Sequence, residues 1–236
     1  MRKLMALLFL AIALDTSADT LSDVKSAVRR LTATQPVRAT FTTEADVKAA
    51  GRFANDNSRR KAAVEVAHDQ AGVTISISSA MLDRAQKQGQ DLIGSIRTIP
   101  IVEALDFRRP MLELLEYATL IEEKPSVFAG RPARLLILKL SPPPKKESNT
   151  IRIGSVKSEE RMSLWVGEDA VPLGAERSEK SSAGIMMFRA SGTSRTKYVF
   201  GRTADRLILA REESEDSGSA LGQNVQRSGV QTLTLH

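Results

Sequence analysis

A strict alternation of side chains over residues 37–48 limits the fold of this chain more than any other feature of its sequence. One set of alternate positions holds Val37, Ala39, Phe41, Thr43, Ala45 and Val47. Every intervening residue is either charged or a threonine. Because successive side chains of a strand point to opposite faces, the pattern predicts a long strand with one buried face and one wet face.

Several shorter segments carry the same extended pattern. Residues 62–67 and 73–78 flank the turn sequence His-Asp-Gln-Ala-Gly, which predicts a hairpin. A meander of antiparallel strands is then expected beyond the proline-rich loop at 142–146. The strands expected after the hairpin are 134–140, 151–156, 161–166, 173–177, 185–190, 197–201 and 207–211.

Helices are expected in four places. Residues 20–34 place Leu21, Val24, Val28 and Leu31 on one stripe, with Thr20 suited to cap the first turn. An apolar stripe over residues 111–123 predicts a second amphipathic helix. Shorter helices are expected at 81–88 and 99–107. The chain therefore belongs to the α+β class, with strands in the majority.

The composition favours one globular domain. Of the 236 residues, 42% are hydrophobic and 26% are charged, which is typical of a packed domain rather than a disordered chain. Residues 19–236 contain no stretch with the composition of an interdomain linker. The acidic, Gly/Ser-rich segment from Glu212 to Gly222 is expected to be mobile, and residues 230–235 are expected to add an edge strand.

The first 18 residues have the form of a secretory signal peptide. Arg2 and Lys3 precede an apolar run over residues 4–14, and the small residues Ser17 and Ala18 follow. The apolar run is shorter than the roughly 20 residues that a permanent membrane span requires. We therefore expect cleavage after Ala18, with Ala13 as the alternative position, and a periplasmic or otherwise extracytoplasmic location.

The balance of charge indicates which polyanions the protein meets. The chain has a formal net charge of +6 and stays basic without residues 1–18. Its basic doublets are scattered and lack interleaved aromatic residues on which bases could stack. No nucleic-acid partner is therefore expected, whereas peripheral contact with an anionic membrane is compatible with the charge.

The residues needed for common enzymatic chemistry are scarce. The chain has no Cys and only two His, which disfavours a zinc site. Ser22 and Lys25 fit the Ser-x-x-Lys pattern of penicillin-recognising enzymes, but neither Ser-Asp-Asn nor Lys-Thr-Gly follows. Adjacent acidic pairs such as Glu159-Glu160 point apart on a strand and do not form a glycosidase pair. A non-enzymatic protein without metal or cofactor is expected.

One hairpin carries a resemblance to a known family. In the segment LWVGEDAVPLGAE an aromatic residue, Trp165, precedes the turn, and Pro172 and Glu176 follow it. This hairpin and the order of the expected elements resemble the bacterial outer-membrane lipoprotein-carrier superfamily. The resemblance implies a strongly curved antiparallel sheet, an incomplete barrel, whose concave side is covered by helices.

The resemblance also implies a function, namely binding of lipids or acylated chains in a hydrophobic cavity under the helices. A covered concave sheet would bring five residues toward one interior, and we expect them to contact the ligand. They are Phe41, Leu115, Trp165, Phe188 and Phe200. A second interpretation of Trp165 is that it only fills the core between sheet and helix.

An interaction module of the same fold is the alternative function. Envelope-stress sensors resemble the same carriers and regulate an anti-sigma factor, so the resemblance also implies an envelope protein as a candidate partner. A co-purifying lipid would favour the carrier, and a single co-purifying protein would favour the module.

The expected export is directly testable. N-terminal sequencing of the protein from its native source should show a chain that begins at Asp19, since residues 1–18 have the form of a removable leader. The protein should fractionate outside the cytoplasm. An intact Met1 or co-fractionation with integral membrane proteins would contradict the assignment.

Overall fold

A computed structural model describes residues 17–50, 58–69, 71–79, 83, 98–141, 155–185, 188–220 and 223–236. The helices are α1 (Ser17–Arg29), α4 (Thr98–Leu105) and α5 (Arg108–Glu116). The strands are β1 (Val37–Ala50), β2 (Ser58–Asp69), β3 (Gly72–Ser76), β4 (Ala118–Phe128), β5 (Arg131–Leu140), β6 (Ser155–Val166), β7 (Pro172–Ile185), β8 (Phe188–Arg202), β9 (Leu207–Ala220) and β10 (Gln223–Leu235).

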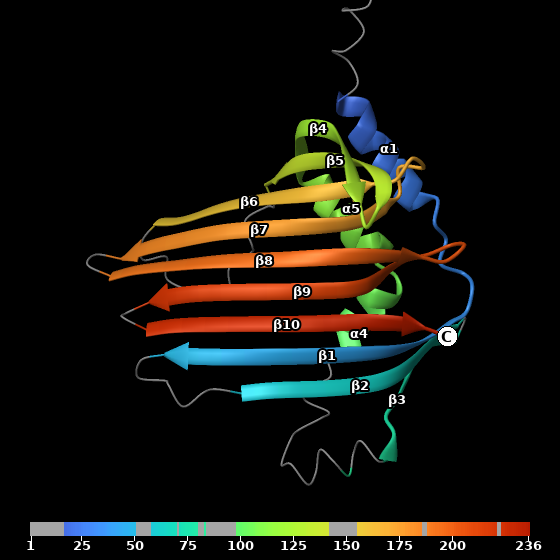
Figure 1. Cartoon of the computed structure of the whole chain (residues 1–236), viewed down its shortest axis with the longest axis horizontal. Coiled ribbons are helices and arrows are strands. Elements are labelled where there is room, and N and C mark those ends of the chain that lie inside the picture. Colours follow the sequence, from blue (N-terminus) through green and yellow to red (C-terminus); the bar gives the residue numbers. More distant parts are fainter. Residues whose placement is uncertain are drawn as a thin grey trace, which may run out of the picture.

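The strands form one open antiparallel sheet in the order β3-β2-β1-β10-β9-β8-β7-β6-β5-β4 (Figure 1). β4 to β10 are a meander in which each of β5 to β10 pairs with its predecessor in the chain. β10 then pairs with β1, so the first and last strands are neighbours inside the sheet. The sheet does not close into a barrel, because β3 and β4 remain at its two edges.

The described helices pack against one face of the sheet, at one end of the strands (Figure 1). We call this the inner face and the opposite one the outer face. Val28 of α1, Ile101 of α4 and Leu115 of α5 are fully buried there. The inner face meets them with alternate residues of the strands, such as Leu138 and Leu164. The hydrophobic core is therefore a single layer between helices and sheet.

The predicted long strand is confirmed as β1. Its alternate residues Ala39 and Phe41 are buried on the inner face, as the alternation requires. The predicted hairpin is confirmed as β2 and β3, and Gly72 in its turn has a φ of 120°, which favours glycine. The helix predicted at 99–107 is confirmed as α4. The helix predicted at 20–34 is confirmed as α1 in its first part, but α1 ends at Arg29, and the remaining residues belong to the connector to β1.

The helix predicted at 111–123 is wrong in its second half. α5 ends at Glu116, and β4 begins at Ala118. Residues 118–123 are strand and not helix because β4 pairs with β5 across a tight turn. Ala129 and Gly130 in that turn both have positive φ, as a two-residue hairpin turn of type I′ requires. Pro125 fits within β4 because an edge strand has one side on which no N–H donor is needed.

Two predictions about the C-terminal region are also wrong. Residues 212–220, expected to be mobile, form the second half of β9 and pair with β8 and β10 on its two sides. Residues 230–235, expected at an edge, belong to β10 in the interior of the sheet. In the first case the backbone ladder forms although the side chains of residues 212–220 supply little apolar surface.

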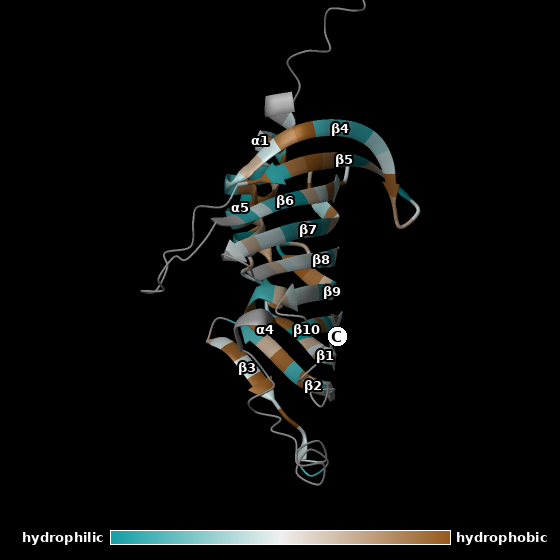
Figure 2. Ribbon diagram, turned by 90° about the vertical axis from the view of Figure 1, so that its left-hand side faces the viewer, coloured by the Kyte–Doolittle hydropathy of each residue, from teal (hydrophilic) through white to brown (hydrophobic). Residues whose placement is uncertain are grey.

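The half of the long strands that lies away from the helices, called the far half, is stabilised by polar cross-strand pairs and not by apolar contacts. On the outer face Thr193 lies 2.7 Å from Ser217, and Ser191 lies 2.9 Å from Ser219, measured between hydroxyl oxygens. In Figure 2 the colours of β7 and β8 are mostly pale or teal and not the brown of hydrophobic residues. Such pairs contribute roughly 0.2–1 kcal/mol each, so many of them are needed to hold an uncovered sheet.

Three predicted features lie wholly or largely outside the described residues. They are the signal peptide at 1–18, the short helix at 81–88 and the loop at 142–146. Of the signal peptide, only Ser17 and Ala18 are described, as the first residues of α1.

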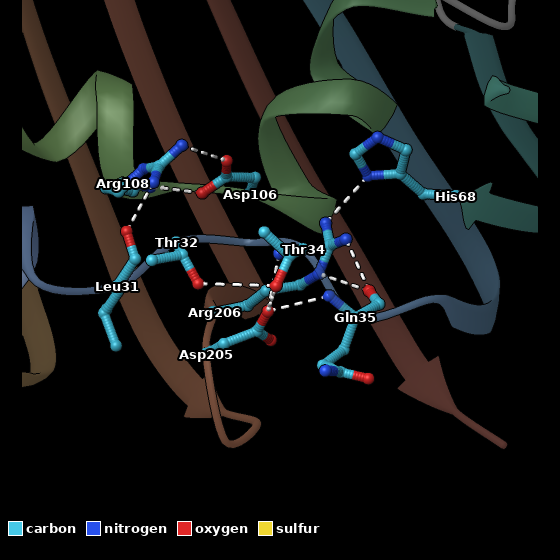
Figure 3. A network of polar contacts seen from close by, with 9 residues as sticks. All are labelled: Leu31, Thr32, Thr34, Gln35, His68, Asp106, Arg108, Asp205 and Arg206. Atoms are coloured by element: carbon cyan, nitrogen blue, oxygen red, sulfur yellow. Dashed lines mark hydrogen bonds and ion pairs between the residues drawn. The ribbon is translucent and has the colours of Figure 1, made fainter. Parts of the chain in front are cut away.

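A polar network fixes the connection between α1 and β1 (Figure 3). Arg206, in the turn between β8 and β9, is 1% exposed and donates from Nε and Nη2 to the carbonyl oxygen of Gln35, at 3.1 and 2.6 Å. Its Nη1 lies 2.7 Å from Nδ1 of His68 at the end of β2. Because a guanidinium only donates, Nδ1 of His68 is the acceptor. Arg206 thus joins the connector, the turn and β2.

Asp205 holds the same connector from its other side. Its Oδ2 accepts hydrogen bonds from the backbone N–H of Thr34 and Gln35, at 2.5 and 2.7 Å, and from the Thr34 hydroxyl at 3.1 Å. Burial alone would raise the pKa of Asp205, but these hydrogen bonds outweigh it and lower the pKa. The folded state therefore favours the ionised carboxylate.

Asp205→Asn should reduce stability at neutral pH by about 1 kcal/mol, a small loss because the carboxylate is partly exposed. A lowered pKa contributes stability above the ordinary value of 3.8, which is lost as the pH falls through the folded pKa. Urea unfolding should therefore show a difference between parent and variant at neutral pH that shrinks in acid. Asp216→Asn, at an exposed strand position, is the control, and an equal difference at every pH would contradict this role.

Candidate functional site

A pocket of about 370 Å³ opens where α4 and α5 meet the inner face of the sheet. Its apolar lining consists of Phe107, Pro110, Leu114, Tyr117, Leu140 and Tyr198. Five acidic or basic side chains complete it, namely Glu103, Glu113, Glu160, Arg177 and Glu212. The volume is at the lower end of the roughly 300–1,000 Å³ typical of ligand pockets, and the mixture of apolar walls with a few polar groups is typical of them too.

An aromatic cluster forms one wall of the pocket. The ring centroid of Phe107, between α4 and α5, lies 5.7 Å from that of Tyr198 and 5.2 Å from that of Phe200. Tyr198 and Phe200 are alternate residues of β8 and stack with centroids 6.1 Å apart. Because Phe200 is buried in the core, it supports the two rings that line the pocket.

An ion pair occupies the sheet side of the pocket. Glu160 of β6 is 7% exposed and accepts a hydrogen bond from Nε of Arg177 on β7. Burial opposes the charge of Arg177, but the hydrogen bond and negative charge of Glu160 outweigh it and raise the pKa of Arg177. Tyr198 also contacts Arg177. The buried carboxylate is thus neutralised inside the protein.

Glu212 of β9 has a different environment. Burial, and after it the negative charge of Glu103, raise the pKa of Glu212. Burial also raises the pKa of Tyr198, and the charge of Glu212 adds to that effect. The ionised form of Glu212 is therefore less favourable in the folded protein than in water. Perturbed ionisable groups in a pocket are typical of functional sites, although they also occur in structural ion pairs.

Other hollows in the sheet have different linings. One of about 520 Å³ lies on the far half of the outer face and is lined by charged and hydroxyl side chains such as Lys180, Thr193 and Arg195. Arg195 already forms a bidentate ion pair with Glu176, in which Nε and Nη2 each lie 2.9 Å from a carboxylate oxygen. A hollow of about 360 Å³ is lined mainly by serine, alanine and glycine. Neither has an aromatic residue in its lining, so the helix-covered pocket is the better candidate.

The structure brings together three of the five residues that sequence analysis singled out. Phe41, Leu115 and Phe200 belong to one core cluster on the inner face, and none is more than 6% exposed. None of them lines the 370 Å³ pocket, although Phe200 packs against its aromatic wall. Their contacts are those of core residues.

Trp165 lies on the outer face, contrary to its expected place in the interior. Its neighbours Leu164 and Val166 are fully buried on the inner face, so the indole between them points the other way. Its Nε1 donates to Oγ of Ser126 at 3.2 Å, and its ring centroid lies 5.5 Å from that of Phe128. Trp165 therefore packs under the end of β4 and not in the helix-covered pocket.

Phe188, the fifth residue, begins β8 and pairs with Ile185 across the hairpin. The described part of Phe188 is its backbone alone. This position is at the end of β8 away from Tyr198 and Phe200, so its backbone lies far along the strand from the pocket.

Sequence reasoning missed the residues that do line the pocket. Tyr198 had a signal, because it is two residues from Phe200 in a strand and so shares its face. Phe107 and Tyr117 flank α5 and had no periodic pattern to mark them. Glu160, Arg177 and Glu212 come together only through the pairing of β6 to β9, which no local pattern shows.

No family model and no curated protein matches the chain. Within the described residues no group of three or more His, Cys, Asp or Glu could hold a metal ion. Also within that part of the chain, no helix has both the length and the apolar character needed to cross a membrane.

The packing of Phe128 on the outer face is testable through Gly174, which pairs with Trp165. A Cβ at Gly174 would lie 2.1 Å from Cζ of Phe128. Gly174→Ala should therefore displace the phenyl ring, cost about 1–3 kcal/mol of stability and shift the fluorescence of the single Trp.

Gly184→Ala is the matched control, because position 184 is on the same strand and face and a Cβ there meets nothing within 4 Å. Adding Phe128→Ala to Gly174→Ala should remove most of the added cost of the methyl group. Equal stability and fluorescence for the two glycine variants would show that the contact is absent.

Proposed function

We propose that the protein is an exported carrier or binding protein of the cell envelope that holds lipids or acylated chains in the pocket beside α4 and α5. The observation that carries the proposal is an open cavity with six apolar or aromatic lining residues, placed between a sheet and its helices. An alkyl chain gains roughly 0.8 kcal/mol for each methylene removed from water, so even a small cavity of this kind supports useful affinity.

We infer further that the sheet acts as an incomplete barrel whose concave side is the inner face, with α1, α4 and α5 as its cover. Support comes from the open ten-stranded sheet and from the burial of all three helices against one face. α1 contacts both α5 and β4. In this arrangement the helices are the parts that would yield to admit a long chain.

The form of residues 1–18 supports placing this activity outside the cytoplasm. Acyl chains are poorly soluble in water, so their movement between membranes requires a shielding protein. A basic net charge would favour transient contact of such a protein with anionic headgroups.

A protein-interaction module is the second candidate, and one observation favours it. Ile121 and Val127 on the edge strand β4 are 56% and 65% exposed, which is unusual for large aliphatic residues near an open sheet edge. In that case β4 would bind an envelope protein, and the pocket would have no ligand.

One preparation separates the two candidates. Protein purified from its native source without detergent would be analysed by native mass spectrometry, by lipid extraction and for co-purifying protein. A carrier should retain lipid or acylated material, and a fatty acid should displace an environment-sensitive apolar dye. One stoichiometric protein partner with no lipid would instead support the interaction module.

A variant that fills the pocket sharpens the test. Leu114→Trp should weaken the affinity for the dye at least about tenfold while the protein stays folded, because Leu114 is half-buried and its side chain lines the cavity. Val102→Trp adds the same indole to an exposed position of α4 outside the pocket lining and should leave binding unchanged. Equal dye affinity in both variants, with circular dichroism like the parent, would place the dye elsewhere.

A further inference from the structure

We propose that this pocket selects amphiphiles with a cationic head group, such as aliphatic amines, over fatty acids. The inference rests on the proposed function and specifies its ligand class. It is carried by the charges that the pocket leaves unneutralised and by the aromatic rings beside them. The basic character of the whole chain would not suggest this preference.

The carboxylates of the lining fall into two groups. Glu113 accepts a hydrogen bond from Arg109 one helical turn earlier, at 2.8 Å, and Glu160 is paired with Arg177. Glu103 and Glu212 form no hydrogen bond or ion pair with another described residue, although Glu103 also interacts with the charge of Arg109. The carboxylates of Glu103 and Glu212 therefore give the lining of the pocket an excess of negative charge.

Glu212 is the stronger of the two candidates for contact with a ligand. It projects from the inner face of β9, next to Tyr198 across the β8–β9 ladder. Every fully buried side-chain nitrogen or oxygen in the described part of the chain has a partner, so the unpaired oxygens of Glu212 must reach open space. That space is the pocket. A cation there would relieve the repulsion between Glu212 and Glu103.

The aromatic lining supports the same ligand class independently. Phe107, Tyr117 and Tyr198 all line the pocket that contains Glu212. Ammonium groups are attracted to the faces of aromatic rings, and cages of such rings are a common way to recognise alkylammonium ligands. The same rings provide apolar surface for the alkyl chain, so one site accommodates both parts of the ligand.

Arg177 is the one lining residue that would favour an acidic head group. Its Nε is engaged by Glu160, and its guanidinium also contacts Tyr198. A fatty acid would therefore have to compete with a buried partner for Arg177 while its carboxylate approached Glu103 and Glu212. The geometry makes the amine the better fit.

Three probes with one chain length test the selectivity. Dodecylamine, dodecanoic acid and 1-dodecanol would be titrated below their micelle concentrations at neutral pH, with affinity measured by calorimetry and by dye displacement. The amine should bind at least about tenfold more tightly than the acid, because a charge-assisted contact with a carboxylate is available to the amine and not to the acid.

The outcomes separate this inference from the proposed function. Equal or tighter binding of the acid overturns the head-group preference but keeps the carrier. If the alcohol binds and the amine binds no better, the preference also fails. If none of the three probes binds, the carrier function itself fails.

Glu212→Gln tests the residue. The variant should lose most of the amine-to-alcohol affinity ratio, and its Tm should not fall, since removal of a desolvated charge beside Glu103 relieves an unfavourable interaction. Glu213→Gln is the matched control, because Glu213 is the next residue, points to the outer face and pairs with Arg211 at 2.7 Å. An unchanged ratio in Glu212→Gln would overturn the assignment.

Discussion

The pairing of β1 with β10 is the interaction on which the rest of the structure depends. It joins residues almost 200 positions apart, such as Phe41 and Leu233, and merges the N-terminal hairpin strands with the β4–β10 meander into one sheet. Both residues are buried against the helical layer. Loop closure over such a distance costs entropy that local contacts do not recover, so this ladder is expected to form late in folding. Arg206 and Asp205 secure the connector that leads into β1.

Local patterns in the sequence predicted elements better than neighbours. Alternation over residues 37–48 indicated a strand and its buried face, because both depend on a local period of two. The same pattern contains no information about which strand lies beside it, and so β10 was expected at an edge. The acidic residues of β9 were misinterpreted for a related reason. Low hydrophobicity there signalled mobility, whereas pairing on both sides supplies the order.

The candidate site was only partly predictable, and Trp165 shows why. Met162, Leu164 and Val166 alternate as an apolar set, which places the intervening Trp165 on the opposite face. The size of the indole suggested that Trp165 lines the interior. Its position in the alternation of the strand places it on the opposite face. Phe200 was correctly expected in the interior. The pocket itself depends on Glu160, Arg177 and Glu212, which are distant in sequence and meet only across four strands.

The position of the pocket follows from a change in composition along those strands. Toward the helices, the inner face carries Leu164, Ala175, Phe200 and Leu209, all buried. One or two inward positions further along, the same strands carry Glu160, Arg177, Tyr198 and Glu212. Beyond them the inner residues are small or polar. Helices can cover the apolar part of the inner face without burying unpaired charge. The helical cover stops where the inner face begins to carry charged side chains. The border therefore combines an apolar wall with ionisable groups, which is the combination that binding an amphiphile requires.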